Sequence, residues 1–434
     1  MSGSFFDQYR NTIKEVFCIN DEAVDMLSFE AERIEGLARQ DKHPLILHIL
    51  LALVTNLLFP LKGLKRNVLL SDEDFVFVSC PDPVFRTKNI GLITGSLKYC
   101  IIYLPTFHVS TSLKYHYFFR KEGIKAFFPT IRLIYVIRAW KRTKKITRLM
   151  DSSYSNVQRK RLFGAMMSFA VHDQVVNYLL KTTDSFKGKW LLEHDKFFFI
   201  PTVFNLHKRG KEITMLQHGI FFRPSSNYFP LFCDKVLCCS EREKRIYSEN
   251  GVSQDRVVVF GAPLQTLQLD RINTLEGKHY DLLVLLTRVD EKNIDLTRRV
   301  LTFIKENYTS VLVRMRPRSQ KNDEMYLSDL LNGIEVSSTN RSIYVDLSNS
   351  EKVVSFSEDA NVEIAKLHKP FIYVSSRSEE SYLNGVTIKN YEEEIQKLME
   401  NEFYSSFNED QYKEILGETN VFVLQEKFMK YIKD

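Results

Sequence analysis

Short apolar runs alternate with longer helix-like stretches along most of the chain. Each run is rich in Val, Ile, Leu and Phe and ends near Gly, Pro or Ser, which is typical of parallel strands buried on both faces. In the first part of the chain, strands are expected at 74–80, 99–105, 196–201, 212–219, 235–240 and 256–263, and helices at 118–149 and 156–182. This alternation predicts an α/β fold with a doubly wound sheet.

The second part of the chain starts the same rhythm again. Strands are expected at 279–287, 310–317, 351–358 and 371–376, with helices at 290–306 and 359–370. Between the parts, 264–278 is polar and has no apolar period, so we interpret it as a hinge. The 434 residues are many for one core, so we expect two domains. They are 1–265, with a helical N-terminal elaboration, and 279–401, followed by a helical segment at 402–434 that crosses back to the first domain.

The predicted topology indicates where a ligand binds. Open α/β sheets bind ligands beyond the carboxyl ends of their strands. Two such domains joined by a hinge are expected to face one interdomain cleft, which is the default ligand site.

Composition narrows the class of protein. With 44% hydrophobic and 26% charged residues the chain is globular, and its net charge of +6 is mild. The six cysteines form no CxxC pair and no zinc-ligand spacing, so we expect reduced thiols and no metal site. The first residues, MSGSFFDQYRNTIKEVF, lack the pattern of a signal peptide, so a cytoplasmic location is expected.

Two segments indicate contact with a membrane. Residues 44–60, PLILHILLALVTNLLFP, are apolar but short of the roughly 20 residues of a span. A buried helix is the favoured interpretation, with a span or an interfacial helix as alternatives. Residues 131–150 form a basic amphipathic stretch without acids, which suits the inner face of the cell membrane or an anionic glycan, and less well nucleic acid. A plain solvated face is equally compatible with it.

Polar residues stand where the strand at 212–219 ends, in the run TMLQHGI. His218 can donate to a phosphate or take a proton from a hydroxyl, because its pKa is close to neutrality. Gln217 can bind the same ligand, and Gly219 permits close approach of the backbone. The alternative is a core histidine bonded to backbone. Glu193 and His194, just before the strand predicted at 196–201, are weaker candidates for a catalytic base on the acceptor side.

A second candidate site is the run VRMRPRS, at 313–319. Arg314, Arg316 and Arg318 alternate, so on one strand they share a face, and guanidinium groups suit phosphate. An edge strand with solvated arginines is the alternative. Thr287 and Arg288, at the end of the strand 279–287, can also reach a phosphate.

A third candidate site is the run SFSEDANVEIAKLHKP, at 355–370. Ser355, Ser357 and Glu358 lead into a helix whose amino-terminal N–H groups can bind an anion. Glu363 lies within that helix. Simple capping of the helix explains the same residues.

The strand-end QHG, joined to CDKVLCCSEREKRIYSENGVSQDRVVVFGAP, resembles the GT-B glycosyltransferases that build surface polysaccharides. Capsular sialyltransferases, Kdo transferases and CDP-glycerol glycerophosphotransferases look similar here. The likeness covers 195–265 well and 279–376 in outline, whereas 1–190 match no family. Related enzymes often carry His-Pro where this chain has Arg316-Pro317.

The resemblance implies a GT-B-like fold of two Rossmann-like domains. The first would bind a glycan or lipid-linked acceptor near His218. The second would bind a nucleotide-sugar donor through Arg316, Arg318, Ser355 and Ser357, with Glu363 near the sugar or ribose. It implies an inverting, metal-independent transferase acting on capsule, lipopolysaccharide or a related polymer, with no cofactor apart from the donor substrate. A nucleotide-sugar epimerase or hydrolase on the same fold is the alternative, and a non-catalytic membrane or nucleic-acid binding module is a third hypothesis.

Overall fold

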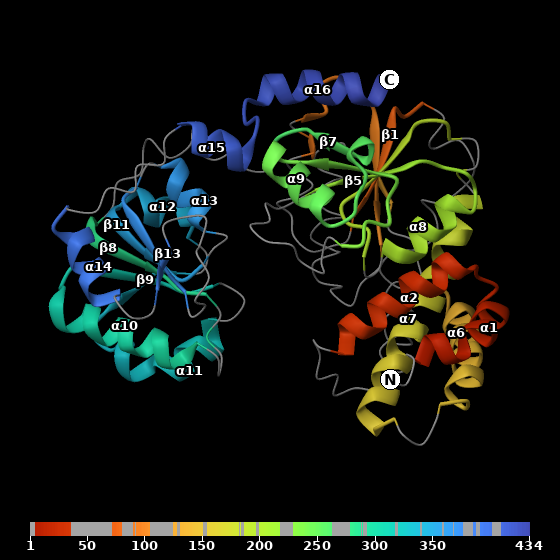
Figure 1. Cartoon of the computed structure of the whole chain (residues 1–434), viewed down its shortest axis with the longest axis horizontal. Coiled ribbons are helices and arrows are strands. Elements are labelled where there is room, and N and C mark those ends of the chain that lie inside the picture. Colours follow the sequence, from red (N-terminus) through yellow and green to blue (C-terminus); the bar gives the residue numbers. More distant parts are fainter. Residues whose placement is uncertain are drawn as a thin grey trace. The chain divides into compact units, whose positions relative to one another are not determined.

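The structure is a computed structural model that divides into two compact units. Met1–Leu264 and Gly417–Asp434 form the first unit, and Gln265–Leu416 form the second (Figure 1). The described residues are 5–35, 72–79, 90–91, 93–104, 125–127, 131–150, 154–181, 183, 186–196, 199–217, 229–262, 278–287, 289, 293–316, 320–338, 341–357, 360–367, 369–375, 385–387, 391–401 and 409–434. The apolar segment 44–60, and 264–277 of the predicted hinge, lie outside them.

Within these residues, the first unit contains a parallel sheet of seven strands in the order β3-β2-β1-β4-β5-β6-β7. The strands are β1 (Phe75–Ser79), β2 (Tyr99–Tyr103), β3 (Lys125–Phe127), β4 (Lys189–Leu192), β5 (Ile213–Leu216), β6 (Lys235–Cys238) and β7 (Val257–Val259). The helices are α1 (Phe5–Phe17), α2 (Asp21–Glu35), α6 (Leu133–Thr147), α7 (Asn156–Lys181), α8 (Ile200–His207), α9 (Glu241–Glu249) and α16 (Val421–Lys433). Because the chain moves from β1 out to β3 and then returns to β4, its winding reverses between β1 and β4.

Most predicted elements of this unit are confirmed, and two are wrong. The strands β1, β2, β5, β6 and β7 and the helix α7 lie where the sequence predicts them. The prediction of a strand at 196–201 is wrong, because Ile200–His207 form the helix α8. The strand of this region is β4, which lies earlier in the chain. A short apolar run fits a buried helix as well as a strand, and Pro201 lies in the first turn of α8, where proline is favoured. The helix predicted at 118–149 is also partly wrong. Within that range, Lys125–Phe127 form the strand β3, and the helix α6 begins only at Leu133.

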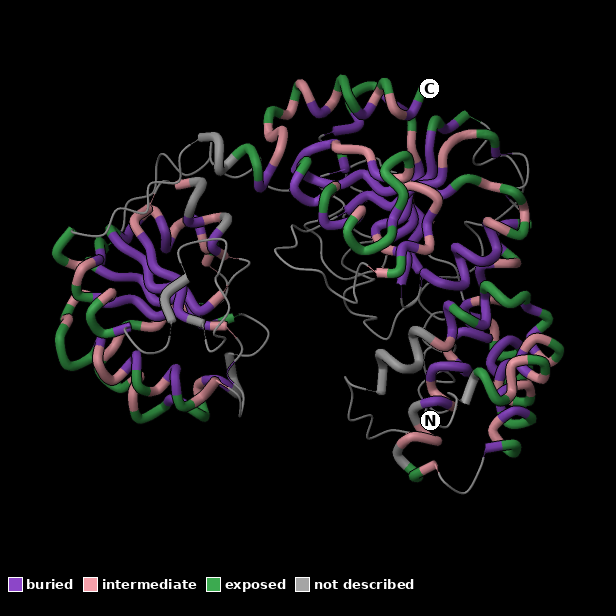
Figure 2. The backbone as a smooth tube through the Cα atoms, viewed as in Figure 1, coloured by how far each residue is buried: buried purple, intermediate pink, exposed green. Residues whose placement is uncertain are grey.

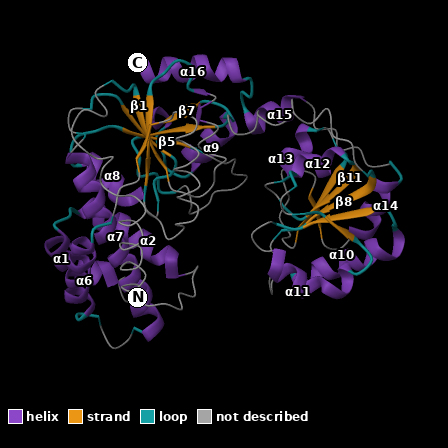
Figure 3. Cartoon of the chain, turned by 180° about the vertical axis from the view of Figure 1, so that it is seen from behind, coloured by secondary structure: helices purple, strands orange, loops and turns teal. Residues whose placement is uncertain are grey.

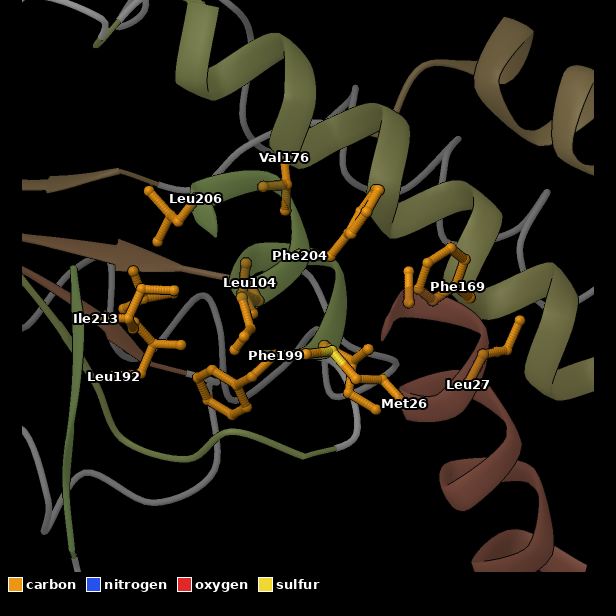
Figure 4. Close-up of a cluster of buried hydrophobic side chains, with 14 of the residues drawn as sticks. Met26, Leu27, Leu104, Phe169, Val176, Leu192, Phe199, Phe204, Leu206 and Ile213 are labelled. Atoms are coloured by element: carbon orange, nitrogen blue, oxygen red, sulfur yellow. The ribbon is translucent and has the colours of Figure 1, made fainter. Parts of the chain in front are cut away.

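The first sheet is buried on both faces (Figure 2). Alternate residues of a strand point to opposite faces, so Val76 and Val78 join one apolar cluster, whereas Phe75 and Phe77 join another. Helices α2, α7 and α8 supply the first cluster. Figure 4 shows its side chains from α2, α7, α8 and β5, including Met26, Phe169, Phe204 and Ile213. The N-terminal helices are therefore part of the core of this unit.

The C-terminal helix α16 covers the other face of the first sheet. Leu424, Phe428 and Ile432 pack in the second apolar cluster, and the Phe428 ring lies edge-on to that of Phe75, with centroids 5.3 Å apart. The Tyr431 hydroxyl lies 2.6 Å from the Thr214 Oγ1 of β5. The last residues of the chain thus complete the core of the unit that contains the first residues.

Gly417 stands where the chain re-enters the first unit, and alanine there is expected to lower the unfolding free energy by about 2–3 kcal/mol. Its φ is +64°, and an added Cβ would lie 2.1 Å from the Cys239 carbonyl oxygen. The measurement is urea unfolding followed by tryptophan fluorescence. Both tryptophans, Trp140 and Trp190, lie in the first unit, so their emission reports its unfolding.

Gly210 provides the matched control for that substitution. Its φ is also +64°, but nothing lies within 4 Å of an added Cβ. Gly210→Ala is therefore expected to cost only the backbone strain, about 1 kcal/mol. Equal losses for the two variants would show that the close approach to Cys239 does not constrain the re-entry of the chain.

His207, at the end of α8, joins three elements of the first unit. Its Nδ1 lies 2.9 Å from Glu22 Oε1 of α2, and its Nε2 lies 3.2 Å from Asp234 Oδ2, just before β6. The hydrogen bond with Asp234 raises the pKa of His207 above its usual value, and the bond with Glu22 adds to this effect. The folded state therefore favours the imidazolium.

The sign of the resulting pH dependence follows from the raised pKa. The stabilisation is complete below about pH 6.5, the pKa in an unfolded chain, and is lost as the pH rises through the folded pKa. Relative to His207→Gln, the parent is expected to gain about 1 kcal/mol or less at pH 6 and little at pH 8.5, since both carboxylates are partly exposed. Urea unfolding at both pH values measures this, with the exposed His279→Gln of the second unit as control. An advantage independent of pH would contradict the assignment.

The second unit contains, within the described residues, a parallel sheet of six strands in the order β10-β9-β8-β11-β12-β13. The strands are β8 (Tyr280–Leu285), β9 (Val311–Arg314), β10 (Glu335–Val336), β11 (Ser350–Ser355), β12 (Phe371–Ser375) and β13 (Gly385–Thr387). The helices are α10 (Ile294–Asn307), α11 (Gln320–Leu331), α12 (Ile343–Ser348), α13 (Asn361–Lys366), α14 (Tyr391–Met399) and α15 (Glu409–Leu416). The predicted strands β8, β9, β11 and β12 and the helices α10 and α13 are confirmed.

The predicted register of the arginines needs a correction. The strand β9 ends at Arg314, so Arg316 follows the strand and does not continue its face. The edge-strand alternative is wrong as well, because β9 lies between β8 and β10.

No described helix is both long enough and apolar enough to cross a bilayer.

Candidate functional site

The second sheet reverses its winding between two neighbouring strands, β8 and β11. The chain steps from β8 to β9 and β10 and then returns to β11 on the other side of β8. All the strands are parallel, so the loops that follow β8, β9 and β11 leave from the same edge. In open α/β sheets this is the position at which ligands bind.

A pocket of ≈ 240 Å³ lies at this position, which we call the switch-point pocket. It is lined by Leu285, Leu286, Arg314, Met315, Arg316, Ile343, Ser357, Ala360 and Glu363. Five of these side chains are apolar, and the other four can bind a charged or hydroxyl group. A mostly apolar lining with a few polar groups is typical of small-molecule sites. The pocket volume is just below their usual range of about 300–1,000 Å³.

The two arginines of the pocket have different surroundings. Arg314 is largely buried and ion-paired with Asp346, and it donates 2.9 Å to the Arg341 carbonyl oxygen. Asp346 is fully buried, and it also accepts from Ser337 at 2.6 Å. The charge of Arg314 is therefore used inside the unit. Arg316, two residues later, is exposed and lines the pocket.

The two serines at the end of β11 also differ in their surroundings. Ser355 is fully buried, and its Oγ donates to the Ser357 carbonyl oxygen (3.0 Å) and accepts from the Ser357 N–H (3.2 Å). It shapes the turn and is not among the lining residues, whereas Ser357 lines the pocket. Glu363 lines it from α13, which has only six residues.

Other predicted donor-site residues are less informative. Thr287 is half-buried two residues beyond β8 and is not a lining residue. Arg288, Arg318 and Glu358 lie outside the described residues.

In the first unit, the predicted QHG site is described only at Gln217. This side chain is buried at the carboxyl end of β5, and its Oε1 accepts from the Tyr247 hydroxyl of α9 at 3.1 Å. The amide is thus held inside the unit. His218 and Gly219 lie outside the described residues.

Glu193 lies at the reversal point of the first sheet. It follows β4 directly, which corrects the prediction that it precedes a strand. Its carboxylate accepts a hydrogen bond from the Ser79 hydroxyl, at the end of the neighbouring β1, and both side chains are buried. The sequence gives no signal for Ser79 as its partner, because 114 residues separate the two.

The residues after Glu193 form a buried ion pair. Lys196 Nζ lies 2.7 Å from Asp195 Oδ1, and neither side chain is exposed. Burial alone would raise the pKa of Asp195, but the Lys196 ammonium and His194 outweigh it and lower that pKa. Asp195 Oδ2 also accepts from the Phe232 N–H at 2.5 Å, and Lys196 donates to the Pro230 carbonyl oxygen. The pair therefore fixes residues 230–232 against the end of β4.

Among the described residues, no group of His, Cys, Asp and Glu is arranged to hold a metal ion.

Comparison with known proteins gives a fold and no family. No protein-family model matches the chain, and no curated protein sequence does so. Solved structures match over 83% of the chain at 12–13% identity. They include UDP-GlcNAc 2-epimerase from Methanocaldococcus jannaschii (TM-score 0.53, 12% identity, 99% of that chain covered), UDP-GlcNAc 2-epimerase from Neisseria meningitidis bound to UDP-GlcNAc (0.51, 12%, 99%) and a co-structure of S. aureus MnaA with UDP (0.50, 13%, 95%). The fold is GT-B-like, with two Rossmann-like domains.

Proposed function

We propose that the protein is a glycosyltransferase that moves a sugar from a nucleotide-activated donor to a growing cell-surface glycan. The observation that carries the proposal is the switch-point pocket. Its lining combines apolar side chains with an exposed arginine, at the point where the winding of a doubly wound sheet reverses. The likeness of the QHG run to polysaccharide transferases supports transfer as the reaction.

The lining residues suggest how a donor would be held. Leu285, Leu286 and Met315 offer an apolar surface to a nucleobase. The Arg316 guanidinium would bind the diphosphate with charge-assisted hydrogen bonds, next to Ser357. Glu363 would accept from a ribose or sugar hydroxyl. The lining residues do not specify which nucleobase or which sugar the donor carries. UDP is the first nucleotide to try, because two of the similar structures contain UDP or UDP-GlcNAc.

In the reaction, an acceptor hydroxyl oxygen would attack the anomeric carbon and form the new glycosidic bond. The bond from that carbon to the phosphate oxygen would break, and its electrons would leave with the nucleotide. Arg316 would stabilise the charge that develops there. We assign removal of the hydroxyl proton to His218, which follows Gln217 directly, with Glu193 as the alternative base.

A nucleotide-sugar 2-epimerase is the second candidate function. The observation that favours it is that the similar structures named above include UDP-GlcNAc 2-epimerases. An epimerase changes its sugar without an acceptor, so the two functions differ in a measurable requirement.

The test is to incubate the protein with UDP-GlcNAc and other nucleotide sugars, with and without surface glycan acceptors, and to identify the products by NMR. A transferase releases nucleotide only when an acceptor is present. A changed sugar configuration without acceptor would instead establish the epimerase. Absence of any conversion, combined with absence of nucleotide binding, would contradict both functions.

A further inference from the structure

The helix α6 presents apolar side chains to solvent. Large hydrophobic side chains are exposed at eight of the described positions, and five of these lie on α6 or beside it. They are Leu133 (43%), Ile134 (45%), Ile137 (39%), Leu149 (40%) and Tyr178 of α7 (38%). Figures 1 and 3 show α6 with α1 and α7 at the end of the first unit that is remote from α16. We call this surface the α6 patch.

The exposure belongs to one side of the helix. The buried residues Tyr135, Val136, Ala139, Thr143 and Ile146 attach α6 to the first unit. The exposed positions all fall within about half of the helix circumference, as expected for 3.6 residues per turn. On this exposed side, Leu133, Ile134 and Ile137 lie in the first two turns, and Leu149 follows the end of the helix.

Basic side chains fill the rest of the same exposed side. They are Arg138, Lys141, Lys144, Lys145 and Arg148, all exposed. In the part of the chain that the structure describes, none of these five has a carboxylate partner, and Lys144 lies over the Trp140 ring at 4.8 Å. A surface with five unneutralised cations is complementary to a dense array of anions.

The exposed aliphatic side chains and the exposed basic side chains together indicate which partner the α6 patch binds. A polynucleotide or anionic glycan in water would contact the cations but leave the aliphatic side chains wet. An anionic bilayer satisfies both, because Leu and Ile enter the boundary between headgroups and acyl chains while Lys and Arg reach the anionic headgroups. We propose that the α6 patch binds the surface of a membrane that contains anionic lipids. This inference is independent of the nucleotide site.

The test is sedimentation of the full chain with vesicles of phosphatidylcholine alone and with vesicles that also contain phosphatidylglycerol. The parent is expected to bind only the anionic vesicles, with an affinity that falls as salt is added. Lys141→Gln with Lys145→Gln is expected to weaken this binding by about thirtyfold, at roughly fivefold for each charge removed. Ile134→Ser with Ile137→Ser is expected to weaken it by about tenfold or more.

Controls come from α16, which lies in the same unit. Lys430 and Lys433 are exposed, and Lys430→Gln with Lys433→Gln removes as much charge as the double lysine variant of α6. Phe422 is 76% exposed, and Phe422→Ser is the control for the double isoleucine variant. These variants are expected to bind like the parent. Tryptophan fluorescence and urea unfolding verify that every variant folds.

Two outcomes would overturn the proposal. One is that the anionic vesicles do not sediment the parent. The other is that the lysine variant loses binding while the isoleucine variant keeps it. That pattern identifies a polyanion site for nucleic acid or an anionic glycan, which competition by polynucleotide would then verify.

Discussion

Replacing Arg316 by alanine is expected to weaken nucleoside diphosphate binding by about 10- to 100-fold. Charge-assisted hydrogen bonds contribute about 1.5–3 kcal/mol, and each 1.4 kcal/mol changes the affinity tenfold. Arg316 is exposed, so its loss is expected to leave the fold of the second unit intact. Isothermal titration calorimetry with CMP, CDP, UDP and GDP, on parent and variant, measures the effect.

Two controls separate a phosphate contact from a general loss of charge. Arg299→Ala removes an exposed arginine from α10 of the same unit and is expected to keep the parent affinity. The corresponding nucleoside, which has no phosphate, is expected to bind parent and Arg316→Ala equally weakly. If the variant binds the diphosphate as tightly as the parent does, Arg316 does not contact the phosphates.

Replacing Asp195 by asparagine is expected to lower the unfolding free energy of the first unit by about 3–5 kcal/mol. The substitution keeps an acceptor for the Phe232 N–H but removes the negative charge that lies 2.7 Å from the fully buried Lys196 ammonium. An uncompensated buried charge carries a penalty of this size. Urea unfolding followed by the emission of Trp140 and Trp190 measures the loss, which is a large share of a typical domain stability of about 5–15 kcal/mol.

The control is Glu212→Gln, which breaks the half-exposed pair of Glu212 and Lys235 in the same unit. Exposed pairs contribute about 0–1 kcal/mol, so a small loss is expected. Adding Lys196→Met to Asp195→Asn also removes the buried ammonium and is expected to restore part of the stability. A loss below about 1 kcal/mol for Asp195→Asn would contradict the description of the pair as buried and ionised.

The sequence predicted most strands because their physical signal is local. Runs such as 74–80 and 351–358 are short, contain Val and Phe, and end in or next to polar or turn-forming residues, as is typical of strands buried on both faces. The run at 196–201 has a similar composition, but its last two residues, Ile200 and Pro201, begin the helix α8, which packs with α2 and α7. Composition alone does not separate the two cases, since both environments are apolar on every side.

The candidate site shows the same division between local and distant signals. Arg316, Ser357 and Glu363, which the sequence analysis assigned to two separate candidate runs, line one pocket. The partner of Arg314 is Asp346, 32 residues later on α12, and no spacing rule connects the two. The alternation of arginines indicated three similar groups, whereas in the structure Arg314 is ion-paired with Asp346 and largely buried, and Arg316 is exposed. A side chain's partner across a sheet depends on strand order, which the sequence pattern does not specify.

A crystal structure of the protein with the nucleotide that binds most tightly tests the central claim most directly. We expect the nucleotide in the switch-point pocket, with its base against Leu285 and Leu286 and its diphosphate within hydrogen-bond distance of Arg316. A nucleotide bound anywhere else in the protein, with the switch-point pocket empty, would contradict the proposed donor site.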